Sequence, residues 1–145
     1  MGLQAIMRTR VRFGETDAAG IVFYPTFFLW FDSGTHGLLR VGDAPSRDKR
    51  GAPKDPLPIV ECGATFLAPL QFDEEIEIVS TVASMGESSL RIEHEVRTLA
   101  GKTCARGFEQ RVFVEIKDGR IAKAAIPADL RARLDGPAAT SKGDA

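Results

Sequence analysis

The chain has 145 residues, about one domain's worth, and 43% of them are hydrophobic, which excludes a wholly disordered or fibrous protein. Nineteen basic and twenty acidic residues give a net charge of −1, whereas nucleic-acid-binding proteins normally carry a strongly basic surface. Cys62 and Cys104 are far apart and lack C-x-x-C spacing, which argues against a disulfide framework or a zinc site. A reducing compartment is expected.

No targeting or membrane-spanning segment is expected. The first ten residues lack an apolar run of signal-peptide length. The longest apolar stretch, residues 21–31, is interrupted by Pro25 and Thr26, and a membrane span needs roughly 20 residues. We therefore expect a soluble, cytoplasmic protein that binds neither membranes nor nucleic acid.

The first predicted element is a strand over residues 7–13. Met7, Thr9, Val11 and Phe13 alternate with three arginines, which is typical of a half-buried strand with a basic outer face. The next residues, 14–24, are rich in glycine and small side chains, so they predict a loop.

A helix is predicted to begin at Pro25, because proline suits the first helical position, and to end at Gly42. Its first turns are apolar on nearly all sides, which indicates a buried helix. Gly34 and Gly37 each weaken a helix by about 1 kcal/mol relative to alanine. They therefore predict the close approach of another backbone, such as a sheet wrapped around the helix.

Residues 43–58 contain four prolines and seven charged residues and predict a mobile loop. The rest of the chain reads as strands over 59–67, 75–79, 90–97, 108–116 and 120–126, followed by a short helix over 128–134. Hairpin turns are expected at 85–86 and 100–101, and another turn at 117–119. One buried helix followed by antiparallel strands is an α+β pattern. We expect a single domain over residues 1–135 and a disordered tail over 136–145.

Few side chains could perform acid–base chemistry. His94 lies on the apolar face of its predicted strand, which is typical of a buried structural histidine. His36 follows Asp32 by four residues, so a local ion pair on the helix is expected. Nothing near Cys62 or Cys104 indicates a reactive thiolate. The sequence contains no serine-nucleophile elbow and no phosphate-binding loop.

The remaining candidates are the carboxylates Glu15, Asp17 and Asp32. Asp17 lies in a small-residue loop between a strand and a very hydrophobic helix, so a pocket there would be apolar and dry. Backbone N–H groups at the helix start near Tyr24 would favour a developing negative charge in that pocket. A carboxylate beside such donors suits acyl transfer, although Asp17 could instead serve only as a loop or helix-capping residue. Without a histidine, no metal is expected at these carboxylates, and no cofactor.

The segment RVRFGETDAAGIVFYPTFFLWFD, residues 10–32, resembles the N-terminal signature of the 4-hydroxybenzoyl-CoA thioesterase family, which has the hotdog fold. The residues that fit the family pattern are Phe13, Gly14, Asp17, Ala19, Gly20, Ile21, Val22, Tyr24, Pro25, Trp30 and Asp32. The later strands are compatible with it, so the resemblance covers roughly residues 7–128.

This resemblance implies an antiparallel sheet wrapped around a long central helix, with acyl-CoA sites at the interfaces of a homodimer or a dimer of dimers (a homotetramer). Asp17 would be the catalytic nucleophile or the base for water, and the Tyr24 N–H would hold the thioester carbonyl oxygen. Asp32 would lie near the acyl group. The residues expected to bind substrate are Gly20, Tyr24, Asp32, Ile59 and Val60.

Two departures from the family pattern matter. The aromatic-CoA member grips the nucleotide phosphates with an Arg/Lys-rich hairpin, but residues 85–89 here contain no basic side chain. Arg91, Arg106 or the 47–54 loop are the candidates for that role. Relatives acting on short acyl chains often have a histidine where this chain has Phe23, which favours an aromatic or bulky acyl group.

The sequence thus predicts an acyl-CoA thioesterase that releases a free acid and CoA. Two alternatives stay open: a hydratase or dehydratase of the same fold, and a non-catalytic acyl- or protein-binding module. The identity of the acyl group does not follow from the sequence.

Overall fold

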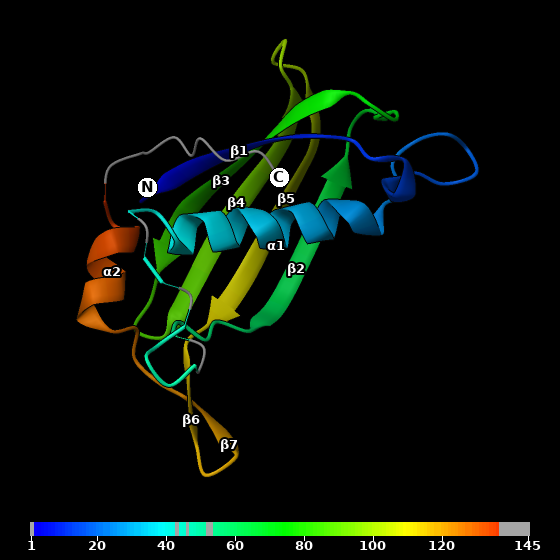
Figure 1. Ribbon diagram of the computed structural model, residues 1–145. Helices are drawn as coiled ribbons and strands as arrows, with labels where there is room; N and C mark the ends of the chain where they lie inside the picture. The colour runs from blue at the N-terminus through cyan, green and yellow to red at the C-terminus, as the bar shows by residue number, and fades with distance from the viewer. Residues whose placement is uncertain (1, 43, 46, 52–53, 137–145) are drawn as a thin grey trace.

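The computed structural model describes residues 2–42, 44–45, 47–51 and 54–136. Five strands form one antiparallel sheet in the order β1-β3-β4-β5-β2. They are β1 (Gln4–Arg10), β2 (Ile59–Phe66), β3 (Glu75–Met85), β4 (Ser89–Thr98) and β5 (Thr103–Val112). Helix α1 (Pro25–Leu39) lies across one face of this sheet (Figure 1). The architecture is α+β, as predicted.

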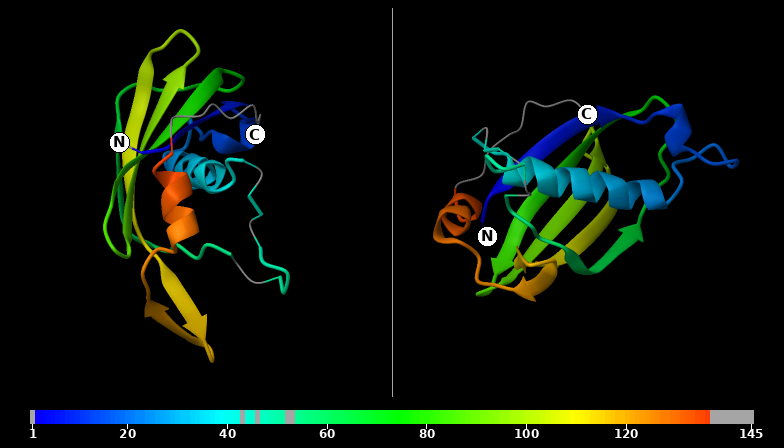
Figure 2. Two further views of the ribbon diagram at one scale, coloured as in Figure 1. Left: turned by 90° about the vertical axis from the view of Figure 1, so that its left-hand side faces the viewer. Right: turned by 60° about the horizontal axis from the view of Figure 1, so that its bottom comes forward.

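Four smaller elements complete the described chain. A 3-10 turn, η1 (Phe13–Glu15), follows β1, and helix α2 (Ala128–Leu134) packs beside the start of β1. The hairpin of β6 (Val114–Lys117) and β7 (Arg120–Lys123) projects from the body of the molecule (Figure 2). The tail predicted for 136–145 lies outside the described residues except for Gly136, as do residues 43, 46, 52 and 53 of the predicted loop. None of the helices in the described part of the chain is long and apolar enough to cross a membrane.

Helix α1 has 15 residues and begins at Pro25, as predicted, but it ends at Leu39, before Gly42. Gly34 lies against β3, where a Cβ atom would overlap the hydroxyl of Ser80, so the predicted close approach is confirmed there. The same prediction was wrong for Gly37, because nothing lies within 4 Å of a Cβ built on it. The sheet therefore approaches the helix on the side that carries Gly34.

The alternation in β4 is confirmed, since Leu90, Ile92, His94 and Val96 are all buried. The predicted first strand needs correction. It runs three residues earlier, and Phe13 is not on its buried side but is 77% exposed. The chain leaves the sheet after Arg10 and turns through η1, so the alternation ends before Phe13.

The strand predicted over 108–116 is also different in the structure. β5 begins earlier, at Thr103, and Phe113 separates it from β6. The early part of β5 was not predicted as a strand, because Gly107 weakens the strand pattern of the sequence there. Its lack of a side chain has a packing reason: a Cβ atom there would overlap the ring of Phe31.

Two apolar clusters fill the space between the helices and the sheet. The first consists of Leu3, Ala5, Leu38, Leu57, Val82, Leu90, Ile92, Phe113, Ile126, Leu130 and Leu134. The second consists of Val11, Val22, Phe27, Trp30, Phe31, Leu70, Ile76, Ile78, Val96, Cys104 and Ala105. A buried polar layer separates them on four elements and consists of Thr35, Ser80, His94, Glu109 and Arg111.

Strand β2 forms one edge of the sheet. It pairs with β5 on one side, and no strand in the described residues pairs with its other side. Apolar side chains along and just beyond it are exposed, among them Ile59, Val60, Phe66 and Leu67. Edge strands of this kind can pair with another chain.

Candidate active site

Glu15 anchors the loop between β1 and α1. Its carboxylate accepts hydrogen bonds from the Trp30 indole N–H at 3.0 Å and from the Arg12 backbone N–H at 2.7 Å. Its carbonyl oxygen accepts the Phe23 backbone N–H at 2.8 Å and the Thr26 hydroxyl at 3.2 Å. All of its acceptor groups are thus used to hold the loop against the helix, which explains Glu15 structurally.

Asp17 occupies a tight turn at the end of that loop. Its N–H donates to the carbonyl of Ile21 and its carbonyl accepts the N–H of Gly20, both at 2.9 Å. Gly20 has a φ of +80°, a conformation that favours glycine. Asp17 Oδ1 accepts the Ala19 N–H at 2.8 Å, and within the described chain no group contacts Oδ2 through a hydrogen bond. One carboxylate oxygen therefore supports the turn, and the other is available on an exposed side chain.

Tyr24 precedes the helix and supplies a backbone donor at its start. Pro25 has no N–H, while the N–H groups of Thr26 and Phe27 donate to the carbonyls of Phe23 and Tyr24. For the Tyr24 N–H, no acceptor is found among the residues that the structure describes. This donor lies at the positive end of the helix dipole, where it can stabilise a developing negative charge.

An apolar hollow of about 470 Å³ adjoins Tyr24. Its lining consists of Ile21, Val22, Tyr24, Phe27, Phe66, Leu67, Ala68, Pro69 and Leu70. The Phe66 ring lies 6.3 Å from the Tyr24 ring and 5.1 Å from the Phe27 ring. The hollow is apolar, as predicted for this place, but it is open in the single chain and Asp17 is not among its lining residues.

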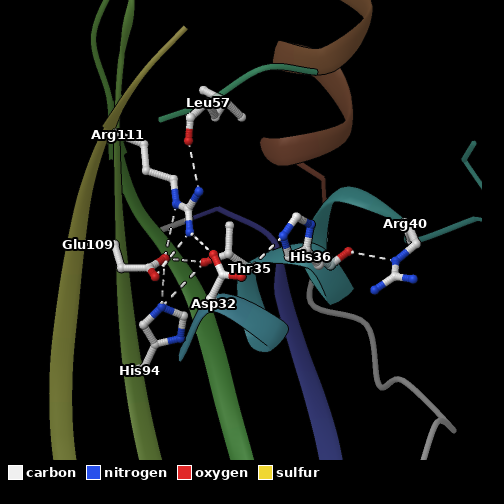
Figure 3. Close-up of polar contacts among 8 residues, drawn as sticks. All are labelled: Asp32, Thr35, His36, Arg40, Leu57, His94, Glu109 and Arg111. Atoms are coloured by element: carbon white, nitrogen blue, oxygen red, sulfur yellow. Dashed lines mark hydrogen bonds and ion pairs between the residues drawn. The ribbon is translucent and has the colours of Figure 1, made fainter. Parts of the chain in front are cut away.

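Asp32 lies on α1 about two helical turns after Tyr24, and its side chain is 46% exposed. The guanidinium of Arg111 donates to Oδ1 at 2.8 Å, and His36 Nε2 lies 3.3 Å from Oδ2 (Figure 3). The predicted pair of Asp32 with His36 is therefore confirmed. The contact with Arg111, which comes from β5, could not be read from helical spacing.

Glu109 is the centre of the buried polar layer, with its side chain only 2% exposed. It accepts hydrogen bonds from Thr35, from His94 Nε2 at 3.2 Å and from two nitrogens of Arg111 at 3.1 Å each (Figure 3). Burial by itself would raise the pKa of Glu109, but the hydrogen bonds from His94, Arg111 and Thr35 lower it to about 2. Glu109 is thus an anion that accepts from every neighbour.

His94 is the satisfied core histidine that the sequence predicts. Because the Glu109 carboxylate only accepts, the hydrogen bond between them requires a proton on Nε2. Nδ1 lies 2.8 Å from the Ser80 hydroxyl, and the ring stacks on Phe31 with centroids 4.9 Å apart. With a fully buried side chain, His94 can reach no substrate.

Ile59 and Val60 lie at the opposite end of β2 from Tyr24. Ile59 is the sheet partner of Arg111, whereas Phe66, seven residues further on, contacts Tyr24. At about 3.3 Å per residue, Ile59 and Phe66 are about 23 Å apart. One chain therefore does not bring Ile59 and Val60 to the hollow beside Tyr24.

Arg91 and Arg106 share a shallow hollow on the face of the sheet that points away from α1. Arg91 stacks over the ring of Phe108 at 4.3 Å and lies 3.5 Å from the carboxylate of Glu93. Arg106 is the sheet partner of Thr65, the residue before Phe66, so it lies close to the end of β2 that borders the apolar hollow. The structure brings the two arginines together, but behind the sheet.

The cysteines are separate free thiols, with Cys62 exposed and Cys104 buried. Burial raises the pKa of Cys104, which makes it a poor nucleophile. Among residues 2–42, 44–45, 47–51 and 54–136, no group of three or more potential metal ligands lies together.

Known proteins match this chain over most of its length. The thioesterase-like superfamily matches residues 11–134. A 4-hydroxybenzoyl-CoA thioesterase of Pseudomonas sp. (strain CBS-3) is 30% identical over 137 residues, covering 89% of this chain and 96% of that protein. A 1,4-dihydroxy-2-naphthoyl-CoA hydrolase of Synechococcus sp. (strain CC9311) is 28% identical over 131 residues, covering 86% of both.

A comparison with a solved structure agrees with these sequence matches. A gentisyl-coenzyme A thioesterase superposes with a TM-score of 0.76 at 35% identity, covering 88% of this chain and 99% of that one. The chain therefore belongs to the thioesterase-like superfamily and is a thioester hydrolase with the hotdog fold.

Proposed function

We propose that this protein hydrolyses the CoA thioester of a hydroxylated aromatic acid to the free acid and CoA. The three relatives described above are named after 4-hydroxybenzoyl, dihydroxynaphthoyl and gentisyl thioesters, all of which are hydroxylated aromatic acyl groups. The proposal for the chemistry depends mainly on one observation. The Tyr24 N–H at the start of α1, which has no acceptor among the described residues, lies beside an apolar hollow and close in sequence to Asp17.

In the proposed reaction the thioester carbonyl oxygen accepts the Tyr24 N–H, which stabilises the negative charge of the tetrahedral intermediate. One such donor typically contributes about 2.7–4 kcal/mol. Asp17 either attacks the carbonyl carbon itself or removes a proton from a water molecule that attacks. In the second route, in which water attacks, the C–S bond then breaks, and the CoA thiolate takes the proton held by Asp17. In the first route, the C–S bond breaks as the acyl-aspartyl anhydride forms, and the CoA thiolate leaves. Water then hydrolyses the anhydride, which regenerates Asp17, releases the free acid and supplies the proton that the thiolate takes.

Two subunits are proposed to complete each site. Antiparallel pairing of two β2 edges would place Ile59 and Val60 of one subunit near the end of β2, and thus near Tyr24, of the other. The exposed apolar side chains on this edge support the pairing. A homodimer is then the smallest active unit, and a dimer of dimers is compatible with it.

The remaining proposed contacts concern the two ends of the substrate. Asp32 would contact the acyl group, and Gly20 would allow the turn that presents Asp17. For the phosphates of CoA, Arg106 is better placed than Arg91, because it lies near the Phe66 end of β2, while Arg91 is engaged by Phe108 and Glu93.

The alternative of a hydratase or dehydratase would use a histidine with a carboxylate. The pair of His94 and Glu109 is buried and cannot meet a substrate. The pair of His36 and Asp32 is half exposed, but Arg111 already binds that carboxylate.

The alternative of a binding module is favoured by the structural role of Asp17 Oδ1 in its own turn. An activity test decides among the three.

The test is a panel of thioesters assayed with a thiol reagent, together with an enoyl-CoA assayed for hydration. We expect release of free CoA from aromatic thioesters and no hydration. The Asp17→Asn variant keeps an oxygen to accept the Ala19 N–H but loses the charge, so kcat should fall about 10²–10⁴-fold. Pantetheine thioesters in the same panel test Arg106, because a KM equal to that of the CoA thioesters would mean that the nucleotide is not recognised.

Asp73→Asn is a matched control. Asp73 is also an exposed loop aspartate, and its φ of 75° is one that asparagine tolerates. Both variants should melt like the parent protein. If Asp17→Asn melts normally and keeps turnover within about threefold of the parent, far short of the expected range, Asp17 is structural and the mechanism is wrong.

A further inference from the structure

Arg111 connects three parts of the molecule at the end of the site where Asp32 lies. Nε and Nη2 donate to the two oxygens of Glu109 on the same strand, at 3.1 Å each. Nη2 also donates to Asp32 on α1, and Nη1 to the carbonyl of Leu57 ahead of β2, both at 2.8 Å. We propose that Arg111 is a positioning residue that sets selectivity for a hydroxyl group on the acyl moiety by holding Asp32.

Arg111 can act only through its partners. Its side chain is only 7% exposed, and the guanidinium faces Glu109, Asp32 and Leu57, so little surface is left for a substrate (Figure 3). Asp32 is the partner that is half exposed. Whatever Arg111 does to binding therefore passes through the position and charge of the Asp32 carboxylate.

The position of Arg111 is itself fixed from behind. Glu109 is held by Thr35 from α1 and by His94 from β4, so it cannot follow a displaced guanidinium. A bidentate pair of an arginine with a carboxylate also has a defined plane. The guanidinium is therefore a rigid anchor, and the helix carboxylate that it binds is restrained to match.

This restraint prepares Asp32 to accept a hydrogen bond. A lone aspartate on a helix surface samples several rotamers, and ordering it on binding costs free energy. With Oδ1 held by Arg111, Oδ2 stays on the exposed side, next to His36. A neutral hydroxyl group can donate to it, whereas an unsubstituted apolar ring would cover a carboxylate without replacing its lost water.

The contact with Leu57 restrains the Arg111 guanidinium further. Leu57 is buried and lies two residues before Ile59, the first residue of β2. The guanidinium is therefore held from a third side as well, which adds to the rigidity of the anchor that binds Asp32. The inference rests on the proposed function, because it takes Asp32 as the contact for the acyl group.

The experiment compares 4-hydroxybenzoyl-CoA with benzoyl-CoA, which differ only in the hydroxyl group. Arg111→Lys keeps the charge beside Glu109 but loses the fork that reaches three partners. We expect it to lower the ratio of kcat/KM for the two thioesters about tenfold, which is the lower end of the range for a hydrogen bond to a charged group. The loss should lie in KM for the hydroxylated substrate. Asp32→Asn should lower the ratio similarly, and the double variant no further.

Arg97→Gln is the matched control, since Arg97 is a partly exposed arginine of β4 that pairs with Glu77 at 3.4 Å. It should leave the ratio unchanged. An Arg111→Lys protein with a lower melting temperature but an unchanged ratio would show that Arg111 is only structural. Additive losses in the double variant would show that it does not act through Asp32. Either result overturns the inference.

Three further outcomes are decisive. If Arg111→Lys does not fold, Glu109→Gln is measured with the same readout, because it loosens Arg111 while leaving the guanidinium in place. An unchanged ratio there overturns the inference as well. A parent protein that hydrolyses both thioesters equally well contradicts the selectivity but not the proposed function. A parent protein that hydrolyses neither contradicts the proposed function.

Discussion

Acid should destabilise this protein through Glu109. The pKa of this buried carboxyl falls from an ordinary value of 4.5 to about 2, because hydrogen bonds from His94, Arg111 and Thr35 outweigh the effect of burial. The folded state therefore binds fewer protons than the unfolded state between these two pH values. The stabilisation is fully present above pH 4.5 and is lost as the pH falls towards 2.

The size of the effect follows from the shift. Each pKa unit corresponds to 1.36 kcal/mol, so a lowering of about 2.5 units corresponds to about 3 kcal/mol of unfolding free energy. No solvent screening reduces this figure greatly, since the Glu109 side chain is 2% exposed. A loss of that size is a large part of the 5–15 kcal/mol by which domains are typically stable.

The measurement is urea unfolding, followed by circular dichroism, at a series of pH values from 7 to 2. Other carboxyl groups also titrate there, so Glu109→Gln is the reference that removes this one titration and keeps the side-chain shape. The variant should be less stable at pH 7, and the difference between parent and variant should shrink by about 3 kcal/mol towards pH 2. A difference that stays constant across this range would refute the assigned charge state of Glu109.

Two more predictions use neighbouring features. Gly34→Ala should destabilise the protein by about 1–3 kcal/mol, because the new methyl group overlaps Ser80, whereas Gly37→Ala should be neutral or stabilise it by up to about 1 kcal/mol; equal melting temperatures for the two variants would contradict the packing described here. Val60→Lys should weaken assembly through the β2 edge and lower hydrolysis with it. Light scattering that finds the unsubstituted protein monomeric at micromolar concentration would contradict both the dimer and the shared site.

The parts of the fold that could be predicted from the sequence are those specified by local pattern. The alternation from Leu90 to Val96 gives β4 its buried face, and Pro25 marks the start of α1. Phe13 shows where such reasoning fails. Its residue type fits the alternation, but the chain turns through η1 and takes Phe13 out of the strand. The ends of elements depend on contacts that lie far away in the sequence.

The candidate site divides in the same way. Asp17 and Tyr24 lie within one continuous segment, so motif and loop context were enough to single them out. Glu109 and Arg111 were missed, because their partners come from α1 and β4 and only the register of β4 with β5 aligns them. The sequence offered no local signal for them, because residues 109–111 are all polar and do not alternate between an apolar and a polar face.

The polar layer between the two apolar clusters also determines where α1 sits along the sheet. Leu38 packs in the first cluster and Phe31 in the second, and apolar contacts alone would tolerate a helix displaced by one turn. Such a slip would move Thr35 away from Glu109 and bring a larger side chain than Gly34 against Ser80. Only one alignment of α1 along the sheet places Thr35 against Glu109 and Gly34 against Ser80. The polar layer thus fixes the axial position of α1 on the sheet. Because the Tyr24 N–H lies about three turns away at the start of the same helix, its distance from the apolar hollow is fixed as well.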